Sequence, residues 1–422
     1  MTNNLEHESA AVTVMDARTG FVLYESAQHE HMYPASVTKV MTALLVLEEV
    51  ENLSEELVFS EYSVESLPYY ASRMHVAAGD AITVHEALYG LMLPSGNEVA
   101  NALAEHVSGS VEAFVAMMNR RAAELGATNT RFINPCGLPG YDQHTTAYDI
   151  ALIMREAINY PVFNEIIATA RFEVSPTYSL PYGFTIRNTN RMILADNEYY
   201  NPWVVGGKTG FTNAAQHTLV SYARRGEHEL IVSVLHAPRG ATFTDTAMLM
   251  DYAFAIPFQT IFRANGESWD VPVLQAVNGE ATEIGTINAE ARGELRLPFP
   301  ADMPELRYEL YIPESLSPPV RIHDVVGHKS FYAGNTLIGE IELVATNFVL
   351  PRVIMPRDRP EPVVATPEPA LNISPFFALM PLATLMLIVI FFVLLRRYRL
   401  RVRYQRRMAR IRYARYGGLE DY

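Results

Sequence analysis

The stretch Pro34-Ala35-Ser36-Val37-Thr38-Lys39 opens a predicted helix that continues through Leu47. Ser36 and Lys39 are three residues apart, so one helical turn brings both side chains to the same face. The free backbone N–H groups and the positive dipole end of the helix lie beside the Ser36 hydroxyl. This pattern suits a serine nucleophile with a lysine base, although an N-cap serine followed by a surface lysine is the more ordinary interpretation of the motif alone.

Lysine usage gives this motif more weight. Of the 33 basic residues in the 422-residue chain, only Lys39, Lys208 and Lys329 are lysines, and the other thirty are arginines. A guanidinium stays protonated at any working pH, whereas a buried ammonium can lose its proton and act as a base. We therefore expect lysine at positions where arginine cannot substitute.

Two further short motifs are candidates for the same site. Ser95-Gly96-Asn97 follows an apolar run, residues 88–93, and precedes a predicted helix. Because Ser, Gly and Asn all favour turns, this motif alone predicts an inter-helix turn. Lys208-Thr209-Gly210 leads through Phe211 into a strand, and a glycine there would let a substrate backbone approach the strand closely. By itself, a solvated lysine near a turn is the ordinary interpretation.

The N-terminal part of the chain mixes helical and strand patterns. Apolar residues at helical spacing predict helices over residues 97–107 and 111–125. Strand patterns over residues 218–222 and 230–235 flank Arg224-Arg225-Gly226-Glu227, which predicts a β-hairpin. These elements indicate a domain in which helices accompany antiparallel strands.

The composition changes after this domain, which we place at residues 1–257. Residues 258–350 contain short apolar-alternating runs such as residues 306–311, separated by Gly and Pro, which predicts a small all-β domain. Residues 351–375 hold seven prolines and are predicted to form a semi-rigid, extended stalk.

Residues 376–395 are an uncharged apolar run long enough to cross a bilayer as a helix, and no polar face marks them as a core helix. Residues 396–422 contain ten arginines and two acidic residues, so their net charge is +8. Because the whole chain has a net charge of −14, residues 1–395 carry −22. The positive-inside rule predicts a single-pass protein of the cell membrane with a cytoplasmic C-terminus and an extracellular body. A lipid bilayer is thus an expected partner, whereas the acidic body disfavours nucleic acid.

Export of the body requires a leader, and residues 1–20 lack a basic n-region and an apolar h-region. We therefore expect either that a leader has been removed or that the gene start is misplaced. The single cysteine, Cys136, excludes a disulfide framework and a thiolate metal cluster, and the absence of a His-Glu-x-x-His run disfavours a zinc peptidase. No metal or other cofactor is predicted.

The order and spacing of the three motifs resemble a known family. Ser-x-x-Lys, then Ser-x-Asn 59 residues later and Lys-Thr-Gly 113 residues after that, is the layout of the penicillin-interacting serine enzymes. The chain is similar to the serine-type D-alanyl-D-alanine carboxypeptidases, the low-molecular-mass penicillin-binding proteins, strongly over residues 10–257. The segments that carry the resemblance are YPASVTKVMTALLVLE, LMLPSGNEVANALAEHVSG, MNRRAAELGATNTRFINPCGL and VVGGKTGFT.

This resemblance implies an α+β fold. A β-lactamase/transpeptidase-like domain, in which helices flank an antiparallel sheet, would be followed by a small all-β domain and a C-terminal transmembrane helix. The implied activity is removal of the terminal D-alanine from peptidoglycan stem pentapeptides, with β-lactam antibiotics as covalent inhibitors. The resemblance makes Ser36 the acylated nucleophile, Lys39 its general base and Ser95 a proton relay to the leaving amine.

The resemblance also implies a set of substrate-binding residues. Asn97 would hold the substrate backbone, and Lys208 and Thr209 would bind its terminal carboxylate. Gly210 is the third residue of the Lys-Thr-Gly motif and belongs to the same set. The backbone N–H of Phe211, together with that of the nucleophile, would form the oxyanion hole.

Two features limit this transfer. Family members commonly place an arginine about 34 residues after the lysine of Lys-Thr-Gly, to grip the terminal carboxylate. Thr242 stands at that place here, and Arg239 is the nearest candidate replacement. Cys136 lies in the segment Asn134-Pro135-Cys136-Gly137, a loop that the family brings towards the cleft, and we expect it to be a free, buried cysteine without thiol chemistry.

Three alternatives stay open at the level of sequence. An endopeptidase or a β-lactamase could use the same scaffold, but no Glu-x-x-x-Asn motif, which class A β-lactamases use for deacylation, occurs between Asn97 and Lys208. A catalytically idle wall-binding protein is the alternative from another class. The three intact motifs argue against it, and the departure at Thr242 keeps it open.

Overall fold

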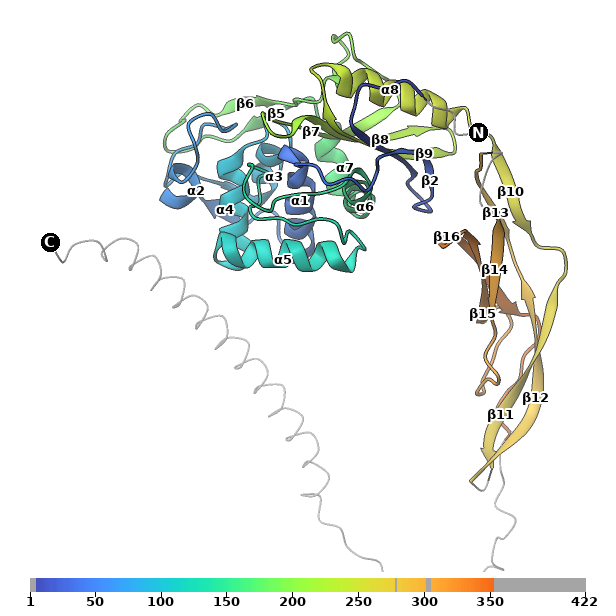
Figure 1. Ribbon diagram of the computed structural model, residues 1–422. Coiled ribbons are helices and arrows are strands. Elements are labelled where there is room, and N and C mark those ends of the chain that lie inside the picture. The colour runs from blue at the N-terminus through green and yellow to red at the C-terminus, as the bar shows by residue number, and fades with distance from the viewer. Residues whose placement is uncertain (1–4, 278, 301–304, 353–422) are drawn as a thin grey trace, which may run out of the picture. The chain divides into compact units, whose positions relative to one another are not determined.

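The computed structural model describes residues 5–277, 279–300 and 305–352 of the chain. A five-stranded antiparallel sheet in the order β2-β1-β9-β8-β7 forms the framework of the N-terminal part (Figure 1). Its strands are β1 (Ala11–Asp16), β2 (Val22–Ser26), β7 (Val204–Thr212), β8 (Gln216–Arg225) and β9 (His228–Ala237).

Helices cover both faces of this sheet. Helix α8 packs on one face, and α6 packs on the other, where the remaining helices gather around α1 (Figure 1). Alternate side chains of β1 enter the two cores, with Val12 and Val14 on the α8 side and Ala11 and Met15 on the other. The helices are α1 (Lys39–Glu49), α2 (Glu61–Glu65), α3 (Val84–Met92), α4 (Asn97–Ser108), α5 (Val111–Glu124), α6 (Ala147–Ala157), α7 (Pro161–Ala168) and α8 (Ala241–Phe254).

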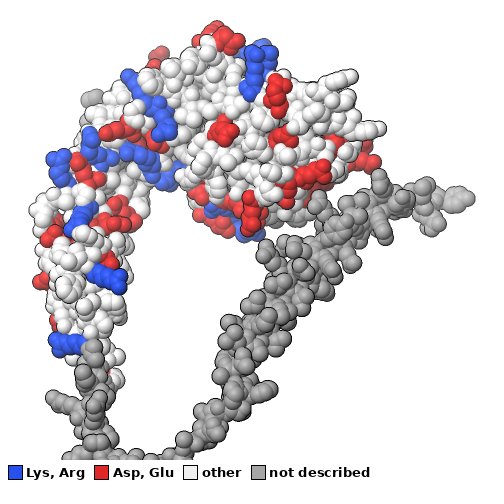
Figure 2. All heavy atoms as spheres, turned by 180° about the vertical axis from the view of Figure 1, so that it is seen from behind, with Lys and Arg blue, Asp and Glu red and all other residues white. Residues whose placement is uncertain are grey.

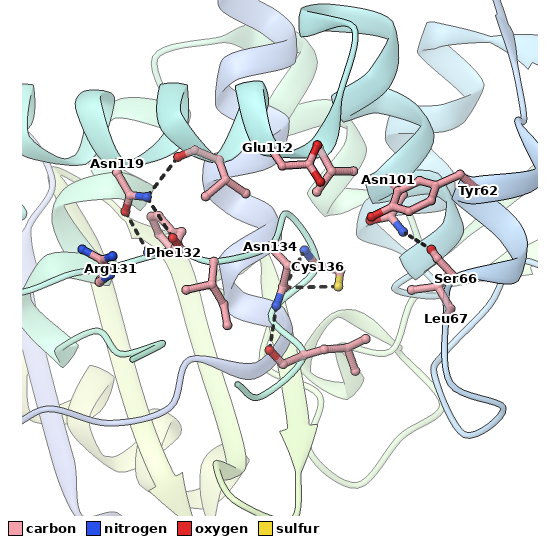
Figure 3. Close-up of a pocket in the computed structure, with 14 residues that line it drawn as sticks. Tyr62, Ser66, Leu67, Asn101, Glu112, Asn119, Arg131, Phe132, Asn134 and Cys136 are labelled. Atoms are coloured by element: carbon pink, nitrogen blue, oxygen red, sulfur yellow. Dashed lines mark hydrogen bonds between the residues drawn. The ribbon is translucent and has the colours of Figure 1, made fainter. Parts of the chain in front are cut away.

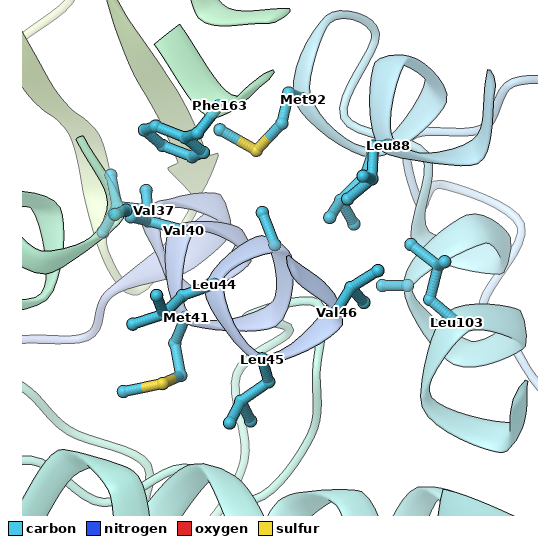
Figure 4. Packing of buried hydrophobic residues seen from close by; sticks show 14 of the residues in the cluster. Val37, Val40, Met41, Leu44, Leu45, Val46, Leu88, Met92, Leu103 and Phe163 are labelled. Carbon is cyan, nitrogen blue, oxygen red and sulfur yellow. The ribbon is translucent and has the colours of Figure 1, made fainter. Parts of the chain in front are cut away.

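Helix α1 is the centre of the helical core. Its residues 39–46 are all buried, which is typical of a helix that is apolar on every side. Figure 4 shows its side chains surrounded by Leu88 and Met92 of α3, Leu103 of α4 and Phe163 of α7. Burying each such side chain contributes about 1.5–3 kcal/mol, so the position of α1 is strongly fixed.

Two short strand pairs and two 3₁₀ turns complete this part. β3 pairs with β4 and β5 with β6, both antiparallel. The first 3₁₀ turn runs directly into α1, and the second lies ahead of β7. These elements are β3 (Glu56–Val58), β4 (Ala81–Thr83), β5 (Arg171–Val174), β6 (Phe184–Arg187), η1 (Ala35–Thr38) and η2 (Arg191–Ile193).

The predicted helices over 97–107 and 111–125 are confirmed as α4 and α5, and the predicted hairpin as β8 and β9. The predicted start of the first helix is wrong by one turn. Ala35 has a φ of +50°, a left-handed conformation outside the helical region, and the 3₁₀ turn η1 precedes α1. Ser36 therefore lies in a tight turn at the entrance to the helix, and Lys39 is the first α-helical residue.

A β-rich region follows α8. It has a two-stranded sheet, β10-β13, and a five-stranded antiparallel sheet in the order β11-β12-β16-β15-β14. The predicted strand over residues 306–311 is confirmed as β14, which is the last strand of its sheet and has all six residues exposed. The strands are β10 (Phe258–Arg263), β11 (Ser268–Val277), β12 (Glu280–Ala291), β13 (Glu294–Pro298), β14 (Leu306–Tyr311), β15 (Val325–Ala333) and β16 (Thr336–Ala345).

The predicted stalk, transmembrane helix and basic tail fall almost entirely outside the described residues. Among the helices of residues 5–352 that are described, none has the length and apolar character needed to span a bilayer.

All three lysines are buried, with 0% of Lys39, 1% of Lys208 and 5% of Lys329 exposed. The basic side chains visible on the face shown in Figure 2 are interspersed with acidic ones. Lys329 lies in the β-rich region, where its Nζ pairs with Glu267 at 2.9 Å and lies 4.1 Å from the centre of the Tyr308 ring and 5.1 Å from that of Phe262. This lysine is a structural cation in an aromatic setting.

Lys329→Ala is expected to lower the free energy of unfolding of the β-rich region by about 2–5 kcal/mol, the range for truncating a large buried side chain. Lys329→Met keeps the contact with the rings, and Glu267 is partly exposed, so this change should cost less than about 1.5 kcal/mol. Both losses of unfolding free energy can be measured by denaturant unfolding of the full chain. A Trp203→Phe background leaves Trp269 on β11 as the single tryptophan, whose fluorescence reports on the β-rich region. Equal losses in the two variants would show that the charge, not the packing, is essential.

Candidate active site

The Ser36 hydroxyl and the Lys39 ammonium meet at the start of α1. Nζ of Lys39 donates a hydrogen bond to Oγ of Ser36 at 3.0 Å. The 3₁₀ turn η1 presents Ser36 to a cleft, while Lys39, one turn later, is fully buried beneath it. The sequence prediction that these two side chains share a face is therefore confirmed.

Lys39 is surrounded by hydrogen-bond acceptors. Besides Ser36, its Nζ donates to Oδ1 of Asn97 at 2.6 Å and to the carbonyl oxygen of Cys136 at 2.7 Å. Burial lowers the pKa of the Lys39 ammonium to about 8, against the opposing effect of the nearby Glu98 carboxylate. At pH 7 about a tenth of this lysine is then neutral and able to accept a proton, and the neutral share grows as the pH rises.

Ser95 and Asn97 lie at the start of α4. Ser95 has a φ of +67°, and its buried Oγ, which lines the cleft, has no hydrogen-bond partner among the described residues. The Asn97 Oδ1 is bonded to Lys39, so its amide nitrogen remains as the donor that can face a ligand. This arrangement leaves the Ser95 hydroxyl and the Asn97 amide nitrogen available to a ligand in the cleft that Ser36 also lines.

Strand β7 forms the opposite wall of the cleft. Thr209, Gly210 and Phe211 line the cleft, whereas Lys208 points inward and its Nζ donates to the Thr209 carbonyl at 2.9 Å. Burial, and secondarily the charge of Lys39, hold the pKa of Lys208 well below its usual value. Direct binding of a carboxylate by Lys208 stays a prediction, because its ammonium lies below the cleft surface.

Gly210 has a different neighbour from the one that the sequence suggested. A Cβ at this position would lie 2.7 Å from the backbone nitrogen of Ser36 and 2.4 Å from Oγ1 of Thr218. The close approach is thus made by the turn that carries Ser36. It brings the Ser36 N–H beside the strand that continues into Phe211, where the sequence predicts the oxyanion hole.

The loop of residues 134–138 holds the third acceptor for Lys39. Asn134 fixes this loop, since its Oδ1 accepts from the Gly137 N–H at 2.7 Å and its Nδ2 donates to the Leu138 carbonyl at 2.8 Å. Gly137 has a φ of +86°, and a Cβ there would lie 1.8 Å from the Ala35 carbonyl. Cys136 is a free, buried cysteine as predicted, and burial raises the pKa of its thiol.

A second pocket, of about 470 Å³, lies against the same loop. Figure 3 shows Asn134 and Cys136 in its wall, together with Asn101 from α4 and Asn119 from α5. Asn119 accepts from the Phe132 N–H and donates to its carbonyl at 2.8 Å each, so this pocket wall is held by hydrogen bonds. The pocket therefore backs the loop that supplies an acceptor to Lys39.

The catalytic cleft has a volume of about 1170 Å³, and several of its lining residues carry no motif signal in the sequence. Thr189 joins the site through a hydrogen bond of 2.6 Å between its Oγ1 and that of Thr209. Arg239 and Thr242 both line the cleft, and binding of a carboxylate by Arg239 stays a prediction. Other lining residues that the sequence did not single out are Tyr69, Tyr70, Arg191, Tyr199 and His217.

Glu98 is a buried carboxylate next to Asn97 that motif spacing did not reveal. It is fully buried at the start of α4, and its Oε1 accepts from the backbone N–H groups of Met74 and His75. Burial raises the pKa of this carboxyl group. Within the described residues, no group of three or more His, Cys, Asp or Glu side chains could hold a metal ion.

Comparison with known proteins identifies the family. The sequence profile of the peptidase S11 family, described as D-alanyl-D-alanine carboxypeptidase, matches residues 1–239. This chain belongs to the S11 peptidase family. It is a serine-type D-alanyl-D-alanine carboxypeptidase of that family, whose ligands, as for penicillin-binding proteins, are peptidoglycan peptides and β-lactams.

Relatives in the family include enzymes of two kinds. D-alanyl-D-alanine carboxypeptidase DacF of Bacillus subtilis is 31% identical over 334 residues, which are 76% of this chain and 80% of the relative. A D-alanyl-D-alanine endopeptidase of Escherichia coli is 33% identical over 220 residues, 51% of this chain and 67% of the relative. Among solved structures, a peptidoglycan synthesis regulatory factor (PBP3) of Streptococcus pneumoniae is 26% identical, with a TM-score of 0.68 over 82% of this chain and all of that one.

The lowered pKa of Lys39 predicts how acylation of the S11 enzyme depends on pH. Only the neutral amine accepts the Ser36 proton, so the rate constant for acylation by a penicillin should rise with pH, with a midpoint about 8. Rapid-quench acylation from about pH 6 to about pH 10 measures this profile. Lys39→Arg is the control, because arginine keeps the charge but cannot accept a proton; above about pH 8 it should acylate about 10²–10⁴-fold more slowly than the wild type, and its rate should not show this rise with pH. A flat wild-type profile would contradict the base role.

Proposed function

We propose that the enzyme removes the terminal D-alanine of peptidoglycan stem pentapeptides through an acyl-enzyme on Ser36. The observation that carries this proposal is the 3.0 Å hydrogen bond between Lys39 Nζ and Ser36 Oγ, made by a fully buried lysine with a lowered pKa. A base within hydrogen-bond reach of a hydroxyl is the arrangement that nucleophilic catalysis requires.

Acylation follows from this geometry. Neutral Lys39 accepts the Ser36 proton as Oγ attacks the carbonyl carbon of the penultimate D-alanine. The developing oxyanion accepts hydrogen bonds from the backbone N–H groups of Ser36 and Phe211, which the close contact at Gly210 brings near each other. The peptide bond breaks when its nitrogen takes the proton from Lys39 by way of Ser95, and D-alanine leaves.

In deacylation, water takes the place of the D-alanine amine that has left, and the Ser36 oxygen becomes the leaving group. Water enters the vacated part of the cleft, loses a proton to Lys39 and attacks the ester carbonyl, and the Ser36 oxygen recovers the proton as the shortened peptide leaves. The unpartnered Ser95 hydroxyl beside the nucleophile suits the relay in both steps. No cofactor is needed for either step.

Other activities on the same scaffold fit less well. Endopeptidases occur among the relatives, so cleavage of cross-linked peptides is a second candidate. The absence of a Glu-x-x-x-Asn motif between Asn97 and Lys208 disfavours rapid β-lactam hydrolysis. An idle wall-binding role is disfavoured because Ser36 and the unpartnered Ser95 hydroxyl line one cleft, and Lys39, buried beneath it, is hydrogen-bonded to Ser36.

We also propose that residues 376–395 anchor the enzyme in the cell membrane, with the catalytic domain outside and residues 396–422 in the cytoplasm. Support comes from the uncharged run and from the ten arginines that directly follow it. An external catalytic domain would place the cleft on the side of the membrane where peptidoglycan lies.

Intact-mass analysis after incubation with benzylpenicillin tests the acyl-enzyme. We expect one penicilloyl adduct per chain, mapped by peptide digestion to Ser36 and lost in Ser36→Ala. Turnover of diacetyl-L-lysyl-D-alanyl-D-alanine should be lost in the same variant. An adduct on another serine, or none on a folded protein, would exclude Ser36 as the nucleophile.

Protease accessibility tests the proposed topology. In protoplasts of a host that expresses the protein with its own or a supplied leader, added protease should digest residues before 376 and spare a tag placed after residue 422. The same protease should digest the tag once the membrane is permeabilised. Protection of the catalytic domain in intact protoplasts would reverse the proposed orientation.

A further inference from the structure

The catalytic cleft differs in charge from the rest of the protein. Residues 1–395 carry −22, yet the residues that line the cleft include two arginines, Arg191 and Arg239, and no aspartate or glutamate. Neither guanidinium forms an ion pair with a carboxylate among the described residues. Two cations without a protein counter-ion in one cleft make a site for an anion.

Aromatic rings constrain the side chain of Arg191. Tyr199 and Phe243 are stacked, with ring centres 4.9 Å apart, and the Arg191 guanidinium lies 6.0 Å and 5.9 Å from the two centres. Arg191 begins the 3₁₀ turn η2, whereas Phe243 belongs to α8, so residues about 50 positions apart in sequence hold this guanidinium at the cleft. A restrained guanidinium loses less conformational entropy when it binds a ligand.

Other groups at this end of the cleft reinforce the positive potential. Arg239 and Gly240 directly precede α8, whose N-terminus has no side-chain cap, and Thr242 in its first turn lines the cleft. His217 packs against Phe211, with ring centres 4.5 Å apart. Burial, and then the charges of Arg239 and Arg191, lower the pKa of His217.

We propose that Arg191 acts together with Arg239 as the clamp for the terminal carboxylate of the substrate, in place of the single arginine that the family resemblance puts at Thr242. The proposal rests on the proposed carboxypeptidase function and names the residues that give it specificity for a free C-terminus. A guanidinium offers two parallel N–H donors that match a carboxylate, and Thr209 and Thr189 add hydroxyl donors in the same cleft.

A pair of substrates that differ only in charge tests this proposal. We compare kcat/KM for diacetyl-L-lysyl-D-alanyl-D-alanine and for its C-terminal amide, and take the acid-to-amide ratio. Arg191→Gln and Arg239→Gln should each lower this ratio about ten- to a hundredfold, mainly through the acid, because a charged hydrogen bond to the carboxylate is lost. Arg191→Lys should retain more of the acid-to-amide ratio than Arg191→Gln, since lysine keeps the positive charge but lacks the two parallel N–H donors of a guanidinium.

Arg187→Gln is the matched control. Arg187 is an exposed arginine at the end of β6, four residues before Arg191, and does not line the cleft, so its variant should keep the wild-type ratio. An unchanged ratio in both cleft variants would overturn the proposal and leave Lys208 and Thr209 as the carboxylate site. Equal losses for acid and amide in Arg191→Gln would show a merely structural role for that residue.

Penicillin acylation of Ser36 separates this proposal from the function on which it rests. Variants that still form the Ser36 adduct retain the catalytic centre, and their acid-to-amide ratios then report on the clamp alone. A wild-type protein that formed no adduct would instead contradict the proposed function. Thermal unfolding of each variant confirms that the exposed arginines can be changed without loss of the fold.

Discussion

The burial of the Lys39 ammonium is the constraint on which the active site depends. A cation removed from water is unstable unless other groups replace its hydration, and here three oxygens do so, from Ser36, Asn97 and Cys136. Each comes from a different segment: the turn before α1, the start of α4 and the loop of residues 134–138. Because these oxygens replace the lost hydration only in part, the pKa of the Lys39 ammonium is lowered to about 8. A pKa close to the working pH is the property that a general base needs.

Close backbone contacts hold these segments together. Gly210 of β7 and Gly137 of the loop both approach the turn that carries Ser36, and neither place has room for a Cβ. The turn is thus held between a strand and a loop, with Ala35 in a left-handed conformation. This enclosure positions the hydroxyl over the lysine, and the buried helix α1 behind it makes the position rigid.

Lysine usage proved informative for a broader reason than catalysis. All three lysines are buried, and only Lys39 and Lys208 lie at the active site. Lys329 pairs with Glu267 beside aromatic rings in the β-rich region, where a slender aliphatic chain with a compact charge fits the available space. The rarity of lysine therefore indicated buried positions with a specific environment. The sequence motifs around Lys39 and Lys208 distinguished the two lysines of the active site from the structural Lys329.

The sequence by itself determined the features that depend on local pattern. Helices α4 and α5, the β8–β9 hairpin and the spacing of Ser36 to Lys39 follow from residue periodicity, turn chemistry and the length of one helical turn. Only the tertiary structure decided that Lys208 points inward, that Gly210 faces the turn that carries Ser36, and that Arg191 reaches the cleft. These facts depend on which distant backbones meet, and residue periodicity carries no information about contacts between segments far apart in the chain.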